Sequence, residues 1–175
     1  MPEFNHETSD VAQRFHRDSD WFVVSRQGAF DVYRAHANSE RSVELFLRWT
    51  ADIEPIVSLH IDHPRDGRRW HAVNRFLPEV REALGRLRWP LAAFGGLEIT
   101  IVSENEQITL MTCLDVVIYS TRDRWRAVVL SEGLSEHDQV PVPVVDPTRI
   151  PWSAAAELSD ALAVAVERLS LQEIV

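Results

Sequence analysis

A short run of histidine and aspartate residues is the densest group of chemically active side chains in the sequence. His60, Asp62 and His63 are close neighbours, and His71 follows after a turn. Alternate residues of a strand share one face, so His60 and Asp62 are expected to point together, with His71 approaching across a hairpin. Imidazole nitrogens and a carboxylate oxygen suit zinc or manganese. A metal held there would acidify a bound water and supply hydroxide for hydrolysis.

The same run also has a plainer interpretation as the solvated end of a hairpin, because local spacing without a defined motif is weak evidence for a site. Arg65, Arg68 and Arg69 stand beside it. They suit either an anionic substrate or ion pairs with an acidic surface, and the second reading is favoured. A metal-dependent hydrolase is therefore kept as the alternative hypothesis, and no residue is assigned a catalytic role.

A second group combines Arg122, Arg124 and Arg126 with Trp125 near the tip of a predicted hairpin. Arginine and tryptophan together can hold phosphates and stack the bases of single-stranded nucleic acid. Arginine over tryptophan is also an ordinary cation–π contact inside one chain. Because the net charge of −9 repels phosphate backbones, nucleic-acid binding is disfavoured although not excluded.

Three further features are interpreted as structural. Cys113 lies in an apolar stretch and is expected to be a buried, inert thiol. Asp115, on an otherwise apolar strand, is expected to bond an arginine or to face solvent. A predicted loop contains the residue types of a hydrolase triad, but no Gly-x-Ser-x-Gly elbow accompanies them. The loop residues in question are Ser131, Glu132, Ser135, His137 and Asp138.

Length and composition bound the class of protein. A chain of 175 residues and 20.0 kDa, 45% apolar and 26% charged, suits one globular domain that buries about 70% of its surface. The single cysteine excludes an internal disulfide and multi-cysteine zinc sites. All 18 basic residues are arginine, which is typical of a high-GC bacterial genome. The polar start and the lack of a long apolar run predict a cytoplasmic protein that does not span a membrane.

The elements that must position these residues can be read from periodicity and turn signals. Residues 1–20 are expected to be a flexible or partly helical arm, followed by a single domain over 21–175. A hairpin is predicted over 21–35, although 29–37 also fits a helix. A helix is predicted over 40–52, with Ser39 as its N-cap. The turn Pro64–Gly67 joins two strands, 56–61 and 68–73, and a second helix is predicted over 76–89.

The second half of the chain favours a meander of three or four strands over 97–130. The apolar runs 116–118 and 127–130 are expected to be central strands covered by helices. Four prolines exclude regular ladder pairing from a connector over 138–151. A last helix is predicted over 153–170. The fold class is therefore α+β, with an antiparallel sheet of five to seven strands and two or three helices mainly on one face.

No motif combines chemistry with the structural context it needs, so the leading hypothesis is a non-catalytic module. We expect a protein-protein interaction or chaperone-like protein that forms a homodimer and binds an unidentified protein, without a cofactor. Its six tryptophans and the apolar, proline-containing segment offer contact surface. The residues expected to form that surface are Val142, Val144 and Trp152, together with Arg122, Arg124, Trp125 and Arg126.

Overall fold

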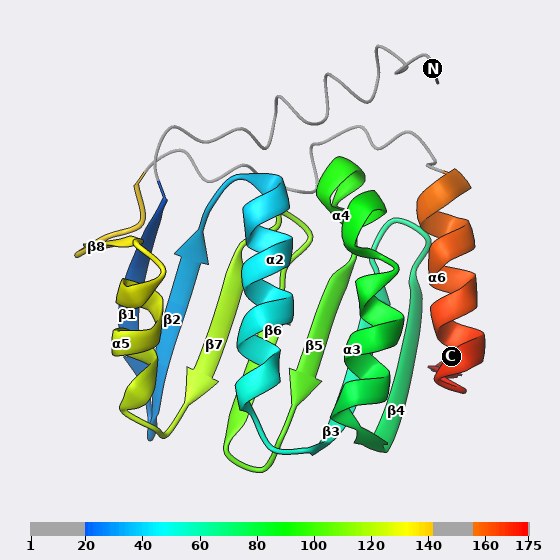
Figure 1. The fold of residues 1–175 in the computed structure, drawn as a ribbon, viewed down its shortest axis with the longest axis horizontal. Helices are drawn as coiled ribbons and strands as arrows, with labels where there is room; N and C mark the ends of the chain where they lie inside the picture. The colour runs from blue at the N-terminus through cyan, green and yellow to red at the C-terminus, as the bar shows by residue number, and fades with distance from the viewer. Residues whose placement is uncertain (1–19, 142–155, 175) are drawn as a thin grey trace.

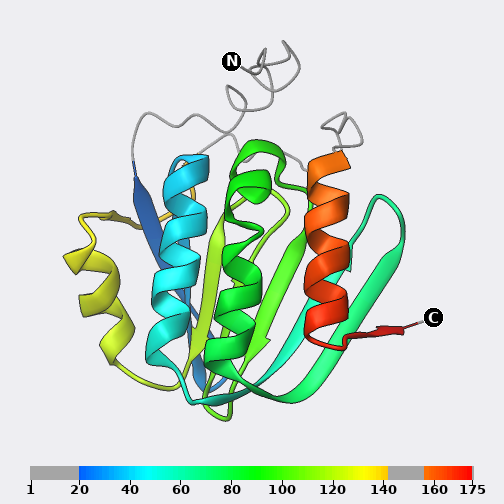
Figure 2. The same ribbon diagram turned by 45° about the vertical axis from the view of Figure 1, so that its right-hand side comes forward.

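A computed structural model describes residues 20–141 and 156–174. They form one nine-stranded sheet with the order β8-β1-β2-β7-β6-β5-β3-β4-β9. All pairings are antiparallel except β1 with β8, so the fold is α+β with a mixed sheet. The helices lie in front of the sheet in Figure 1 and stay on that side in the turned view of Figure 2. The strands are β1 (Trp21–Gln27), β2 (Phe30–His36), β3 (Ile56–His63), β4 (Arg68–Phe76), β5 (Glu98–Val102), β6 (Glu106–Leu110), β7 (Val116–Ser120), β8 (Ser135–His137) and β9 (Gln172–Ile174).

The predicted N-terminal hairpin is confirmed as β1 and β2, which resolves residues 30–36 as strand. Gly28 takes a φ of 61° in the two-residue turn, a conformation that favours glycine. The helix predicted over 40–52 is also present, as α2 (Ser39–Trp49) followed by a 3-10 turn over Thr50–Asp52. Its N-cap is Asn38, one residue before the expected Ser39, and the Asn38 side chain accepts from the amide of Arg41.

The single helix predicted over 76–89 is wrong. The structure has two helices, α3 (Leu77–Gly85) and α4 (Arg88–Phe94). Pro90 lies in the first turn of α4 and does not end a helix. A proline is tolerated there because the first amides of a helix have no intrahelical acceptor. Helix α3 packs on β3 and β4, α4 packs against α2, and α6 (Ala156–Arg168) lies beside both.

The meander is confirmed over β5, β6 and β7, but its predicted last strand is wrong. Residues Arg124–Ser131 form a helix, α5, on the same side of the sheet as the other helices. Trp125 and Val129, four residues apart, are fully buried on one face of α5. The apolar run 127–130 suited a strand locally, but burial of Trp125 and Val129 on one helical face overrides that preference.

The described residues contain nine strands instead of the expected five to seven, and five α-helices instead of two or three. The two strands with no counterpart in the expectation are the three-residue edges, β8 and β9. Segment 142–151 of the predicted connector, the first residues of the predicted last helix and the N-terminal arm up to residue 19 lie outside the described residues. None of the helices in the described part of the chain combines the length and apolarity needed to cross a bilayer.

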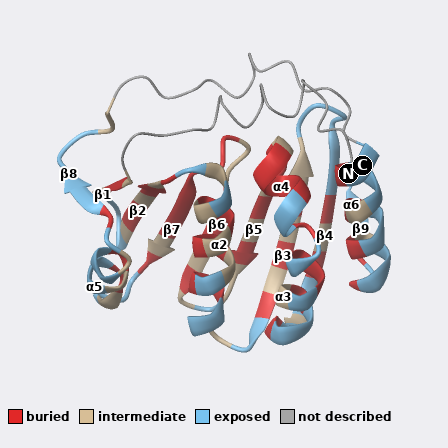
Figure 3. Cartoon of the chain, turned by 45° about the horizontal axis from the view of Figure 1, so that its top comes forward, coloured by how far each residue is buried: buried red, intermediate tan, exposed pale blue. Residues whose placement is uncertain are grey.

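The two faces of the sheet differ in character. One face packs against the helices and supplies the core, with Leu59, Ile61, Ile101, Ile108 and Ile118 fully buried. Figure 3 shows the buried strands behind helices whose outer turns are exposed. The alternate strand residues point the other way, where no described helix packs. We call this second side the open face.

A buried carboxylate connects α5 and the turn after α2 to the sheet. The side chain of Glu106 at the start of β6 is 0% exposed. Its Oε1 accepts from the Trp125 indole at 2.6 Å and from the Ser120 hydroxyl at 3.3 Å. Arg124 donates to Oε2 at 2.9 Å and to the carbonyl of Asp52 at 2.8 Å. Glu106 thus links β6, β7, α5 and the turn after α2.

Glu54 extends this network and predicts how stability responds to acid. Burial by itself raises the pKa of Glu54, but Ser103, Asn105 and the cation of Arg122 together lower the pKa to about 2, from an ordinary 4.5. A carboxylate with a depressed folded pKa stabilises the fold above pH 4.5 and loses that contribution as the pH falls towards 2. After solvent screening, the contribution is about 1 kcal/mol.

We therefore expect Glu54→Gln to be less stable than the wild type at pH 6 and equally stable near pH 2. The measurement is urea unfolding of both chains at pH 6, 4 and 2, followed by circular dichroism. A stability difference that stays constant across this range contradicts the assigned ionisation.

Candidate functional site

The structure divides the four predicted metal-site residues between the two sides of the β3–β4 hairpin. His60, Asp62 and His71 lie on the open face, whereas His63 points to the helical side. Within residues 20–141 and 156–174, no three side chains of His, Cys, Asp or Glu come close enough to hold a metal ion. The proposed zinc or manganese site therefore has no assembled ligand set among the described residues.

Two of the predicted residues do come together. His60 and His71 are directly opposite each other in the β3–β4 register, with near-parallel rings whose centroids are 6.2 Å apart. Two residue pairs further along, on the same face, Asp62 lies 3.7 Å from Arg69, and its other neighbour in the sheet is Glu98. Burial and the charge of Asp62 raise the pKa of Glu98, and Arg69 partly offsets this. Glu98 therefore gives up its proton less readily than an ordinary glutamate.

The most buried polar group of the open face lies further along the strand order, where β2 pairs with β7. Asp115 is fully buried just before β7, and its Oδ2 accepts from Nε and Nη2 of Arg34 at 2.8 and 2.6 Å. Its Oδ1 lies 2.6 Å from Nδ1 of His36. The Trp21 ring stacks on His36, with ring centroids 4.4 Å apart. The expectation that Asp115 bonds an arginine is confirmed.

A carboxylate bound to Nδ1 of a histidine is the arrangement that orients a general base in hydrolases. Here the same carboxylate also carries an arginine ion pair, so its charge is already balanced by Arg34. The His36 side chain is 12% exposed, under the Trp21 ring. These contacts fix the positions of β1, β2 and the start of β7 relative to each other. They also give the buried carboxylate oxygens of Asp115 hydrogen-bond partners inside the chain.

One cross-strand row connects the two clusters. Starting at Arg34 in β2, the register runs through Val117, Thr109 and Thr100 to His60 and then His71. Thr100 and Thr109 share a hydrogen bond of 3.0 Å between their hydroxyls. The open face is therefore one continuous surface of aliphatic, aromatic and polar side chains, and much of its polarity is paired within the chain.

The predicted arginine and tryptophan contact residues are held by contacts inside the chain. Trp125 is fully buried on Glu106, with Arg124 over its ring at 4.8 Å, so its ring has no face free to stack on a base. Arg122 pairs with Glu54, and Arg126 pairs with Glu136 at 2.8 Å. Val142, Val144 and Trp152 lie outside the described residues.

The remaining sequence candidates also have structural surroundings. Cys113 is buried, as expected, and lies in the turn between β6 and β7. The hydroxyl of Ser131 donates to the carbonyl of Val128 at 2.7 Å, at the end of α5. His137 lies in β8, tilted against Trp21 with ring centroids 6.3 Å apart. The sequence analysis missed Trp21, Arg34 and His36, because their link to Asp115 depends on the pairing of β2 with β7.

Comparisons with protein-family models, with curated proteins and with solved structures give no match to this chain.

Proposed function

We propose that this protein is a non-catalytic protein-interaction module that forms a homodimer through the open face of its sheet. The observation that carries the proposal is the asymmetry of the two layers: the helices cover one side of a nine-stranded sheet and leave the other without a described helix. Two such faces can pack against each other at about 10 Å, as in a sandwich.

The chemistry of the open face suits burial against a second protein surface. Several of its polar groups have partners in the chain, as Asp115 and Thr109 show, although Nδ1 of His71 is buried without one among the described residues. Covering such groups costs less than covering unpaired ones, because the lost contacts with water are already replaced. Half-buried apolar side chains such as Tyr119 and Val102 supply area whose burial favours association.

The charge of the open face favours a second copy of this chain as the occupant. The whole chain carries −9, so two copies repel each other over most of their surface. The strand residues of the open face, together with Asp115, contain two arginines and three carboxylates, a balance of only −1; these are Arg34, Arg69, Asp62, Glu98 and Asp115. The open face is therefore a place where two acidic copies can meet with little repulsion.

Light scattering after size-exclusion chromatography tests the proposal on the full chain. We expect a mass of twice 20.0 kDa for the wild type. Tyr119→Arg, in the strand β7 of the open face, is expected to give a monomer with an unchanged circular dichroism spectrum. Val164→Arg is the matched control, because Val164 is 45% exposed on α6, on the helical side.

A wild-type monomer at about 100 µM contradicts the dimer, because a specific interface of standard size binds more tightly than that. A dimer that survives Tyr119→Arg but dissociates with Val164→Arg assigns the interface to the helical side and overturns the role of the open face.

A further inference from the structure

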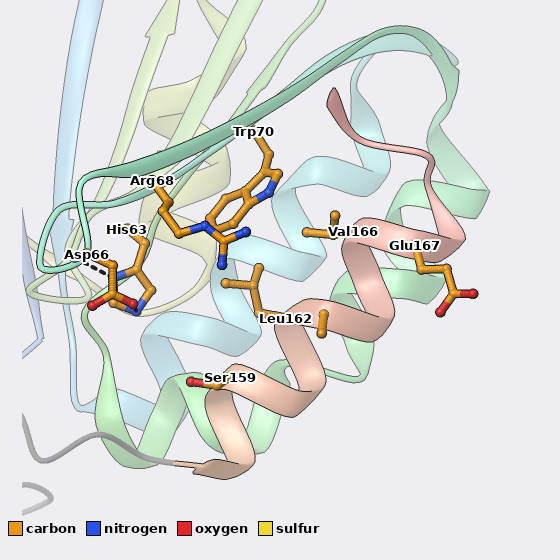
Figure 4. A pocket seen from close by; sticks show the side chains of 9 residues that line it. His63, Asp66, Arg68, Trp70, Ser159, Leu162, Val166 and Glu167 are labelled. Atoms are coloured by element: carbon orange, nitrogen blue, oxygen red, sulfur yellow. Dashed lines mark hydrogen bonds and ion pairs between the residues drawn. The ribbon is translucent and has the colours of Figure 1, made fainter. Parts of the chain in front are cut away.

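A separate cavity lies on the helical side, where the end of the β3–β4 hairpin meets α6. It has a volume of about 240 Å³. This is below the ~300–1,000 Å³ typical of pockets for drug-sized ligands, so its occupant must be small. In Figure 4, Arg68 and Trp70 reach from β4 towards Leu162 and Val166 of α6, and His63 and Asp66 stand at the hairpin end.

The interior of the cavity is apolar. Leu162, Ala163 and Val166 present methyl groups from one side of α6, and Trp70 closes the floor from the sheet. Trp70 is only 4% exposed, and the Arg68 guanidinium lies over its ring at 4.6 Å. A short aliphatic or aromatic group is therefore the part of a ligand that fits between α6 and the guanidinium plane.

Two hydrogen-bond donors converge at the hairpin end of the cavity. Arg68 uses Nε and Nη2 for Glu173, at 2.8 and 3.0 Å, which occupies two of its five N–H groups. Nδ1 of His63 accepts from the backbone amide of Asp66 at 3.4 Å, so in the neutral ring the proton is on Nε2. Nε2 lies 3.5 Å from Asp66 Oδ2, which is too long for a full hydrogen bond.

The surrounding charges limit the ligand to a single negative charge. Asp66 is 54% exposed beside His63, and Glu167 lines the opposite end of the cavity with its carboxylate directed away from Arg68. Arg68 is already paired with Glu173, but its remaining N–H groups can still bind the two oxygens of one ligand carboxylate. A doubly charged phosphate would meet the repulsion of three nearby acidic groups.

We propose that this cavity binds a small monocarboxylate with an apolar body, its carboxylate on Arg68 and His63 and its body against α6. The same chemistry is offered by a free organic acid and by the C-terminal residue of a peptide that ends in an apolar side chain. The cavity is separate from the open face, so the inference does not depend on dimer formation.

Binding can be followed on the full chain by NMR titration of the six tryptophan indole N–H signals. The probes are phenylacetate and 4-methylpentanoate as free acids, N-acetyl-leucine as a peptide end, and phenylacetamide as the neutral analogue. We expect the signal that disappears in Trp70→Phe to shift with the carboxylates, and phenylacetamide to bind at least about tenfold more weakly. Equal binding of the amide overturns carboxylate recognition, and no shift of that signal at millimolar probe overturns the site.

Two pairs of variants separate the cavity from general effects. Ala163→Phe fills the cavity from α6, and Val164→Phe places the same side chain at the next, exposed position. Arg68→Met removes the cation, whereas Arg69→Met removes its neighbour on the open face. We expect Ala163→Phe and Arg68→Met to weaken phenylacetate binding by about tenfold or more, and the two controls to leave it unchanged. Preference for N-acetyl-leucine over both free acids assigns a peptide end as the ligand, and the reverse preference assigns a free acid; equal losses in a variant and its control overturn the proposal.

Discussion

Replacing Glu106 by leucine is expected to lower the free energy of unfolding by about 3–5 kcal/mol, a large fraction of the ~5–15 kcal/mol typical of a domain. The loss has a specific origin. Leucine leaves the fully buried Trp125 indole and the Ser120 hydroxyl without their acceptor, and it leaves Arg124 without its carboxylate. Urea unfolding monitored by circular dichroism measures the change.

Two matched variants show whether the loss of stability at position 106 comes mainly from the lost charge or from the lost hydrogen bonds. Glu106→Gln keeps an oxygen that can accept from Trp125, so we expect about half of the loss. Glu104→Leu changes an exposed residue in the same β5–β6 turn and is expected to alter stability by less than about 0.5 kcal/mol. Equal effects at positions 104 and 106 would contradict the role given to the Glu106 network.

The second large effect is expected at the buried ion pair of the open face. Asp115→Leu removes the carboxylate that balances Arg34 and bonds His36, and it is expected to cost about 3–5 kcal/mol. The loss comes mainly from a cation left without its partner. The double variant Arg34→Met/Asp115→Leu replaces the pair by apolar side chains, and we expect it to recover about half of the lost stability.

Chemical unfolding of the wild type, both single variants and the double variant gives the coupling energy between Arg34 and Asp115. A favourable coupling of about 1–3 kcal/mol agrees with the contacts. Strictly additive losses of stability would show that the contribution of Arg34 does not depend on Asp115. That result would contradict the role given to this ion pair in joining β2 to β7.

Local signals were enough for the hairpins and for α2, because a turn residue or a cap fixes each of them. Gly28 in β1–β2 and Pro64–Gly67 in β3–β4 both join strands at the expected positions. The strand predicted over 127–130 is wrong because its structure depends on a distant residue. Its valines fit a strand, and nothing near them in sequence indicates that Trp125 must reach Glu106, nineteen residues earlier.

The candidate sites show the same boundary between local and distant information. His60 and His71 could be placed together because a hairpin joins their strands. Asp115, a lone aspartate in an apolar stretch, was expected either to bond an arginine or to face solvent. That the partner is Arg34 follows only from the pairing of β2 with β7. The cavity beside α6 likewise depends on how a distant helix meets the β3–β4 hairpin.

The position of β2 in the strand order has a consequence for biosynthesis on the ribosome. Tyr33 in β2 pairs with Ile118 in β7, so the first hairpin emerges from the exit tunnel long before its neighbour in the sheet exists. Strands β3 to β7 pair among themselves and can assemble as one nucleus, whereas the hairpin must wait and then dock by closing a long loop. During that interval one edge of β2 is open to wrong partners, which makes the nascent N-terminal hairpin the stretch most in need of protection by a holdase.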